Sequence, residues 1–98
     1  MAGYGVLPKE RLSVTTAAAV GFAALLGAAR VAVVTVDTDK IRYWVDGSTP
    51  TSTQGHEVAA GGSFELVGRD TLRNFRAIGS GAATAILEIS YFRDLVAT

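Results

Sequence analysis

The chain has 98 residues, of which 49% are hydrophobic and 18% charged, and its nine basic residues balance nine acidic ones. This length supports one hydrophobic core, and the surplus of apolar residues over that of a typical soluble monomer favours burial between subunits. No run of like charge indicates a nucleic-acid or anionic-membrane partner, and the absence of cysteine excludes disulfides, thiolate metal ligands and thiol nucleophiles.

The N-terminal residues 1–10 include two glycines and a proline and show no periodicity. This predicts an arm outside a single domain that spans residues 11–98. Within the arm, Tyr4, Val6 and Leu7 are apolar enough to pack on a neighbouring subunit. The arm residues are therefore candidates for contact with a partner.

Residues 11–16 alternate between polar and apolar and predict the first strand. The alanine-rich segment 17–29 contains glycines and has no polar face, so we expect a buried irregular connection with a helical turn at 23–26. Arg30 ends this segment before the ~18 to 20 apolar residues that a membrane-spanning helix needs. Mixed charges at 9–11 are unlike a signal peptide, so the sequence predicts no membrane partner and synthesis in the cytoplasm.

Residues 30–36 are rich in β-branched side chains and predict a central strand, because they are apolar on both faces. Residues 37–40 have turn chemistry, and 41–45 then read as the second strand of a hairpin. On that strand Arg42 and Trp44 share a face and form a candidate contact pair. Aromatic Trp44 is also the residue that a carbohydrate-binding module would use to stack a sugar ring.

The longest predicted loop, 46–55, is rich in hydroxyl side chains and is expected at the surface. Its tip residues Thr49, Pro50 and Thr51 are candidates for partner contact, since a stiff loop loses little entropy on docking.

The remaining elements are short strands at 56–59 and 63–67, a helical turn at 69–73 capped by Asp70, and strands at 74–78 and 84–92. Glycines in the 79–83 segment predict a hairpin between the last two strands. Alternation assigns Phe75 to the core and Arg76 to a contact surface. Together the elements predict an all-β fold, a small antiparallel β-sandwich or jelly-roll-like domain of about seven short strands.

No constellation of catalytic residues is evident, so the chain is not expected to be an enzyme. His56 is the only histidine, and without cysteines it is too few for a zinc site, which needs three or four ligands. It is also not a credible base for a hydroxyl nucleophile, because that role needs an imidazole oriented by a carboxylate. Asp37 and Asp39 are spaced so that their carboxylates could hold a hard cation such as calcium. The further ligands of a calcium loop are missing, so a charged turn is the favoured interpretation. The Gly79-Ser80-Gly81 run lies between strands and lacks the helix that a phosphate site needs. The sequence predicts no cofactor.

Several short motifs together resemble a family of small uncharacterised virion proteins of tailed bacteriophages. They are IRYWVDG at 41–47, PT at 50–51, GH at 55–56, GSFEL at 62–66, NFRAI at 74–78 and ISYF at 89–92. The resemblance extends over residues 12–93. It implies a β-sandwich structural protein of the particle, such as a capsid decoration or cement protein, a head-fibre or spike base, or a neck component.

We therefore expect a virion structural protein that binds the major capsid protein or another virion protein and assembles as a symmetric homo-oligomer, with a trimer favoured. Two alternatives remain open: a carbohydrate- or receptor-binding module of a fibre, and a neck or tail adaptor. A cellular β-sandwich adaptor is a further alternative. The resemblance carries no catalytic residues, and the contact candidates are those named above.

Overall fold

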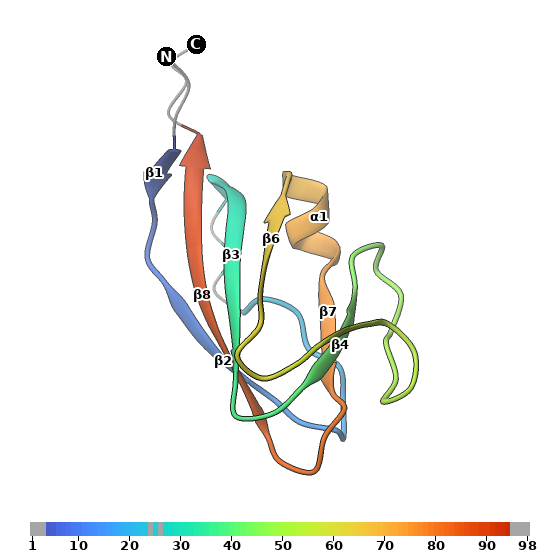
Figure 1. The fold of residues 1–98 in the computed structure, drawn as a ribbon. Coiled ribbons are helices and arrows are strands. Elements are labelled where there is room, and N and C mark those ends of the chain that lie inside the picture. Colours follow the sequence, from blue (N-terminus) through green and yellow to red (C-terminus); the bar gives the residue numbers. More distant parts are fainter. Residues whose placement is uncertain (1–3, 24, 26, 95–98) are drawn as a thin grey trace.

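The computed structural model describes residues 4–23, 25 and 27–94, and these form two antiparallel sheets packed face to face (Figure 1). The expectation of a small all-β sandwich is confirmed, with eight strands in the described residues instead of seven. The elements are β1 (Tyr4–Val6), β2 (Glu10–Val14), β3 (Ala29–Asp37), β4 (Ile41–Trp44), β5 (His56–Val58), β6 (Ser63–Val67), α1 (Arg69–Asn74), β7 (Arg76–Gly79) and β8 (Ala85–Asp94).

The large sheet has five strands in the order β1-β8-β3-β6, and β2 pairs with β8 further along the same edge as β1. The nine-residue strand β3 lies between β6 and β8, so its predicted central position is correct. The small sheet has the order β5-β4-β7. Every pairing in both sheets is antiparallel.

Two predicted hairpins are wrong, and both errors have the same cause. β3 pairs with β6 and β8, whereas β4 pairs with β5 and β7, so the 38–40 turn carries the chain from one sheet to the other. The 80–84 turn does the same between β7 and β8. Turn-forming residues are equally suited to a hairpin and to a corner between sheets, because both require only a local reversal of direction.

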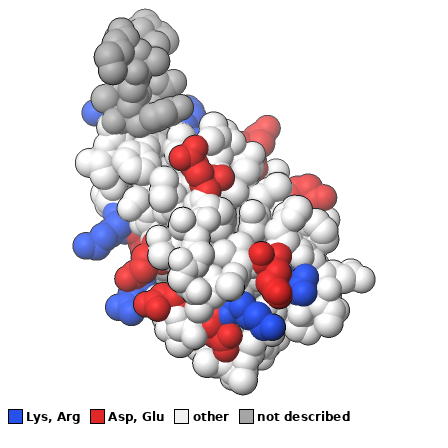
Figure 2. All heavy atoms as spheres, in the orientation of Figure 1, with Lys and Arg blue, Asp and Glu red and all other residues white. Residues whose placement is uncertain are grey.

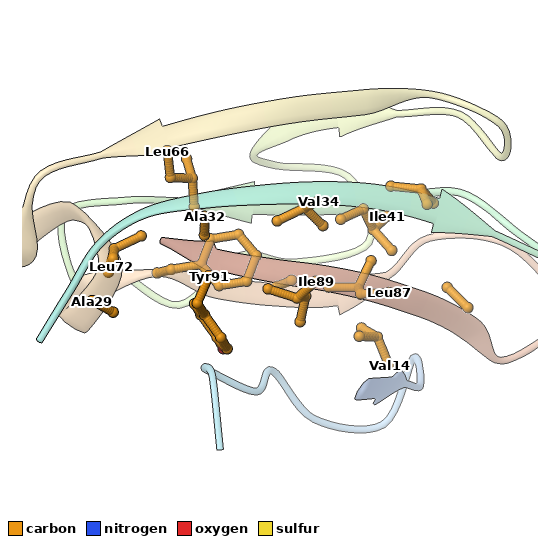
Figure 3. Close-up of a cluster of buried hydrophobic side chains, with 14 residues drawn as sticks. Val14, Ala29, Ala32, Val34, Ile41, Leu66, Leu72, Leu87, Ile89 and Tyr91 are labelled. Carbon is orange, nitrogen blue, oxygen red and sulfur yellow. The ribbon is translucent and has the colours of Figure 1, made fainter. Parts of the chain in front are cut away.

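The core lies between the two sheets and is built from alternate residues of each strand (Figure 3). Figure 3 shows Val34 of β3, Ile41 of β4 and Tyr91 of β8 pointing into this layer. On β8 the buried residues recur at every second position, as a strand with one covered face requires. The predicted core position of Phe75 is confirmed, since its side chain is fully buried.

An aromatic cluster ties the irregular 15–28 connection to the core. Phe22 stacks on Phe75 with ring centroids 4.4 Å apart and meets Tyr91 edge-on at 5.5 Å. Nearby, Val20 exchanges two backbone hydrogen bonds with Ala77 of β7, which adds one residue to the edge of the small sheet. The described residues of the connection form no regular strand or helix, as expected, but its predicted burial is wrong, because the described residues of 17–28 are exposed or only partly buried. The predicted helical turn at 23–26 lies partly outside the described residues.

The N-terminal residues differ from the predicted arm. Residues 4–6 form β1, which pairs with the end of β8 from Tyr4 opposite Asp94 to Val6 opposite Phe92. The helical turn at α1 is confirmed, but Asp70 does not cap it: the N-cap position is Gly68, with φ of 101°. Asp70 instead lies in the first turn, with its carboxylate 3.9 Å from the Arg73 guanidinium.

Candidate docking surfaces

An apolar row crosses the outer face of the large sheet. Successive cross-strand partners place Val6 of β1 beside Phe92 of β8, Phe92 beside Val31 of β3, and Val31 beside Val67 of β6. We call these four residues the apolar row. Val6 is 74% exposed and Val67 is 57% exposed, so both ends of the row are open to solvent.

The row exists because β3 is apolar on both faces. Its Ala32, Val34 and Val36 point into the core, so Val31 and Val33 must point outward. The bulge between Ala29 and Val31 fixes this phase. Val33 is 36% exposed and lies one row further along the same face, between Ser90 and Glu65.

Two shallow grooves adjoin Val33 on this outer face. The first has a volume of about 360 Å³ and is lined by Val31, Val33, Phe92 and one carboxylate, that of Glu65. The second, of about 490 Å³, is polar at one side, and its lining residues are Lys9, Glu10, Arg11, Val33, Thr35, Glu88, Ile89 and Ser90. The outer face therefore changes from apolar near the row to charged towards β2.

Charge on the surface is mixed. Figure 2 shows acidic and basic side chains interspersed over the visible face, without a region of one sign. The ion pair between Arg11 and Glu88, at 3.4 Å, is exposed on both sides and contributes at most a fraction of a kcal/mol. Electrostatics therefore supplies little of the binding energy that this face offers.

The three candidates from the predicted arm lie on the same edge of the large sheet. Val6 is a member of the apolar row, so its expected exposure is borne out. Leu7 donates its backbone N–H to the carbonyl oxygen of Tyr91 at 2.9 Å and packs partly against the core. Tyr4 pairs through its backbone with Asp94, and its side chain lies outside the described part of the structure.

Arg42 and Trp44 lie on the small sheet, away from the apolar row. The Arg42 guanidinium donates to the carbonyl oxygens of Gly55 at 2.9 Å and Ser52 at 3.2 Å, and it is 3.5 Å from the Glu57 carboxylate. It thus fastens the 46–55 loop to β4. Trp44 is half-buried and meets the His56 ring edge-on, with centroids 5.2 Å apart.

Polar groups at the tip of the 46–55 loop form hydrogen bonds within the loop itself. Thr51 accepts hydrogen bonds on Oγ1 from the backbone N–H groups of Thr53 at 3.3 Å and Gln54 at 3.0 Å. Pro50 is fully buried, so its assignment as a contact residue is wrong. Thr49 and Thr51 remain exposed.

Arg76 has a structural role that its sequence position did not indicate. Its Nη1 donates to the carbonyl oxygens of Phe75 at 2.8 Å and Arg73 at 3.4 Å, and the side chain lies against Gly21. A side chain at Gly21 would displace it. Although Arg76 is the cross-strand partner of Trp44, its guanidinium is directed to backbone and not to an open surface.

The two aspartates that the sequence suggested as cation ligands, Asp37 and Asp39, accept hydrogen bonds from backbone N–H groups at the turns. Asp37 accepts the Thr38 N–H at 2.8 Å, and Asp39 accepts the N–H groups of Lys40 and Ala83, each at 2.8 Å. These bonds, first that from Ala83, hold the pKa of Asp39 below its usual value. Within the described ranges no three His, Asp or Glu side chains gather to ligate a metal.

Sequence reasoning missed three members of the apolar row, Val31, Val67 and Phe92, as well as Val33. The signal was present, because a strand that is apolar on both faces in a two-layer fold must show one face outward. Comparisons with protein-family models, curated proteins and solved structures find no match for this chain. No helix in the described part of the chain has the length and hydropathy to traverse a bilayer.

Proposed function

We propose that this protein is a structural component of a tailed-phage virion, a decoration or cement protein that binds assembled capsid subunits as a symmetric oligomer. The observation that carries the proposal is the apolar row on the outer face of the large sheet, whose two end members, Val6 and Val67, a single copy leaves exposed. The motif resemblance described above supports the virion assignment. The small sheet, whose Arg42 and Arg76 side chains serve the fold, offers less free apolar surface.

The arrangement of the row matters more than its exposure. Single exposed valines are common on protein surfaces, but here the exposed Val6 and Val67 are aligned across four hydrogen-bonded strands with the partly exposed Phe92 and the buried Val31 between them. The row stands on backbone that is held by pairing on both sides over β8 and β3. A rigid row loses little conformational entropy when a partner covers it, so its burial contributes efficiently to assembly.

A substitution at Val33 tests the use of this face. Val33→Lys places a charge in the centre of the face without disturbing the core, because the side chain is directed outward and its cross-strand partner is Glu65. We expect wild-type protein to sediment as an oligomer, with a trimer favoured, and the Val33→Lys variant to sediment as a monomer. Val33→Thr, which keeps the β-branched shape, is the matched control and should remain oligomeric.

Particle attachment is measured separately. Purified particles should carry the wild-type protein in a fixed stoichiometry. Particles assembled with the Val33→Lys variant should lack the protein and should open at a lower temperature. Immunogold labelling distinguishes the capsid surface from the neck or tail. Absence of the protein from particles would contradict the virion assignment.

The carbohydrate-binding alternative depends on Trp44, which is half-buried beside His56. A glycan array with Trp44→Ala as the comparison variant decides this point. A decoration protein gives no sugar-dependent signal with either chain, whereas a fibre module gives a signal that the substitution removes.

A further inference from the structure

The strand edges of the two sheets are not equally protected. The β7 edge is covered by Val20, whose N–H and C=O bond to Ala77 at 2.8 and 2.9 Å. The β5 edge has only three residues, and the edge formed by β1 and β2 is interrupted at residues 7–9, which include Pro8. Short edges, prolines and covering segments are three of the devices that prevent further strand pairing, and a charged side chain on the edge, such as Glu65 here, is another that a partner must match. Of the first three, the five-residue strand β6 has none among the described residues.

Backbone geometry gives β6 a free row of hydrogen-bonding groups. The β3–β6 ladder is bounded by bonds from Val36 N to Gly62 O at 2.9 Å and from Gly68 N to Arg30 O at 2.7 Å. In an antiparallel ladder alternate residues bond to the same neighbour, so Phe64 and Leu66 face β3. The N–H and C=O groups of residues 63, 65 and 67 are therefore directed to the open edge, and no hydrogen bond of the described residues uses them.

We propose that β6 accepts an extended strand of a partner protein whose residue opposite Glu65 is lysine or arginine. Glu65 is the central residue of the free row, and its exposed side chain lies on the outer face. Addition of a strand to this edge continues the large sheet and supplies the missing backbone partners. This inference rests on the proposed assembly role and names the kind of partner segment that the role involves.

Glu65 also argues against a second copy as the occupant. Two β6 strands paired about a two-fold axis with full overlap would place Glu65 directly opposite its own copy, and like charges in that position are destabilising. A shifted register avoids the repulsion but leaves one of the three free residues on each strand unpaired. A partner with a basic residue at this point pairs fully and gains an opposite-charge contact.

The adjoining groove has the chemistry that such a residue requires. Its lining combines the Glu65 carboxylate with the apolar side chains of Val31, Val33 and Phe92. The charged head of a lysine or arginine on the added strand meets the Glu65 carboxylate, which borders this groove, while its aliphatic stem packs on apolar side chains at the β6 edge. Val67, 57% exposed beside the same edge, extends the contact to apolar residues that flank the basic one.

Amide NMR spectra of the isolated full chain with designed peptides test the proposal. One short capped peptide alternates threonine and valine around a central lysine, and its matched control has glutamate at the centre. At millimolar concentration the lysine peptide should shift the amides of residues 63, 65 and 67 and slow their hydrogen exchange. It should bind about fivefold more tightly than the glutamate peptide.

Two variants sharpen the test. Glu65→Lys should reverse the preference, so that the glutamate peptide binds more tightly than the lysine peptide. Val67→Pro removes an N–H that points away from β3, so it should abolish binding of both peptides while the spectrum stays that of a folded chain. Absence of binding, or equal affinity for the two peptides, would overturn the proposal.

Self-association through this edge is a separate outcome. If the three amides become protected without peptide as protein concentration rises, a second copy occupies β6 and the proposal is wrong. Failure here is also distinguishable from failure of the proposed function. A chain that attaches to particles but ignores the peptides contradicts only the β6 inference, whereas a chain that binds the lysine peptide but is absent from particles contradicts the virion assignment.

Discussion

The Tyr91 hydroxyl adds a side-chain bond to the pairing of β8 with β2, at the carboxylate of Glu10. Tyr91 is fully buried, and its hydroxyl donates to Oε1 of Glu10 at 2.5 Å. The other carboxylate oxygen of Glu10 accepts the Ala23 N–H at 2.9 Å. Burial, and then the bond to Glu10, raises the pKa of Tyr91 far above its usual value of 10.0. The side chain therefore works as a neutral donor in this fold.

Removal of this hydroxyl should weaken the fold. Tyr91→Phe removes a bond to a charged acceptor, which typically contributes about 1.5 to 3 kcal/mol, and it should lower the free energy of unfolding by roughly that amount. Tyr43→Phe is the matched control, because burial alone, without a carboxylate partner, raises the pKa of the Tyr43 hydroxyl. Urea titration at neutral pH measures both. Equal midpoints for the two variants would contradict the role of the Glu10 bond.

The same residue gives a prediction for alkaline pH. Because the pKa of Tyr91 is higher in the folded chain than in the unfolded one, its stabilisation is complete below the unfolded value of 10.0 and is lost as pH rises above it. Urea midpoints measured between about pH 9 and about pH 11 should fall for the wild type. The fall should be shallower in Tyr91→Phe, and Tyr43, whose pKa is also raised by burial, should account for part of the remainder.

At the scale of elements, the two turns that cross between sheets are joined by one carboxylate. Asp39, in the turn after β3, accepts the backbone N–H of Ala83, in the turn before β8, at 2.8 Å. Gly81 lies so close to this carboxylate that a side chain there would displace it. Asp37 differs, because its carboxylate accepts the N–H of the next residue, Thr38, and does not reach the turn before β8.

Asp39→Asn should reduce the loss of folding stability that occurs as the pH is lowered. The pKa of Asp39 is lower in the folded chain than its usual value of 3.8, so the stabilisation is present above that value and is lost as pH falls through the folded pKa. Thermal unfolding measured from neutral pH down to about pH 3 should therefore show a shallower decline in the variant. Asp37→Asn is the comparison variant, because it changes a neighbouring carboxylate that does not join the two turns.

Gly81→Ala tests the same link from the opposite side. The added methyl group should displace the Asp39 carboxylate, so the variant should lose stability by the same route as Asp39→Asn. The two changes together should cost less than the sum of their separate effects. Gly27→Ala is the matched control, because its position is open and should tolerate the methyl group. Additive effects in a double-mutant cycle would contradict the shared mechanism.

For the whole molecule, local patterns predicted the strands but not how they pair. Alternation and β-branched content located seven of the eight described strands and the buried Phe75, because these depend on one face being covered. They did not distinguish a hairpin from a crossing turn, and they missed β1, whose partner lies at the other end of the chain. Sheet membership depends on contacts between distant segments, which no local window contains.

The candidate surfaces show the same limit. Val6 was predicted as a contact from its terminal position, but the apolar row emerges only when β1, β8, β3 and β6 are aligned. Pro50 and Arg76 were predicted as contacts because proline-containing loops and alternating arginines are usually exposed. Pro50 is instead buried, and Arg76 turns back to bond backbone carbonyls.

The central position of β8 leads to a prediction for global stability. Leu87 is fully buried on this strand, which pairs with β1, β2 and β3. Leu87→Ala should cost about 2 to 5 kcal/mol, a large share of the stability of a domain of this size. Val67→Ala, at an exposed position, should shift the urea midpoint little. A small effect at Leu87 would contradict the assignment of β8 to the core.

The antiparallel pairing of β1 with the end of β8 also determines how the fold resists force. Tyr4 and Asp94 are partners at the same end of the large sheet, so tension applied at these two residues pulls the strands apart crosswise. Each ladder bond is then loaded in turn, as in the opening of a zipper, whereas strands pulled lengthwise share the load across all bonds. A molecule pulled through the ends of these two strands should therefore open at lower force than one pulled along a single strand.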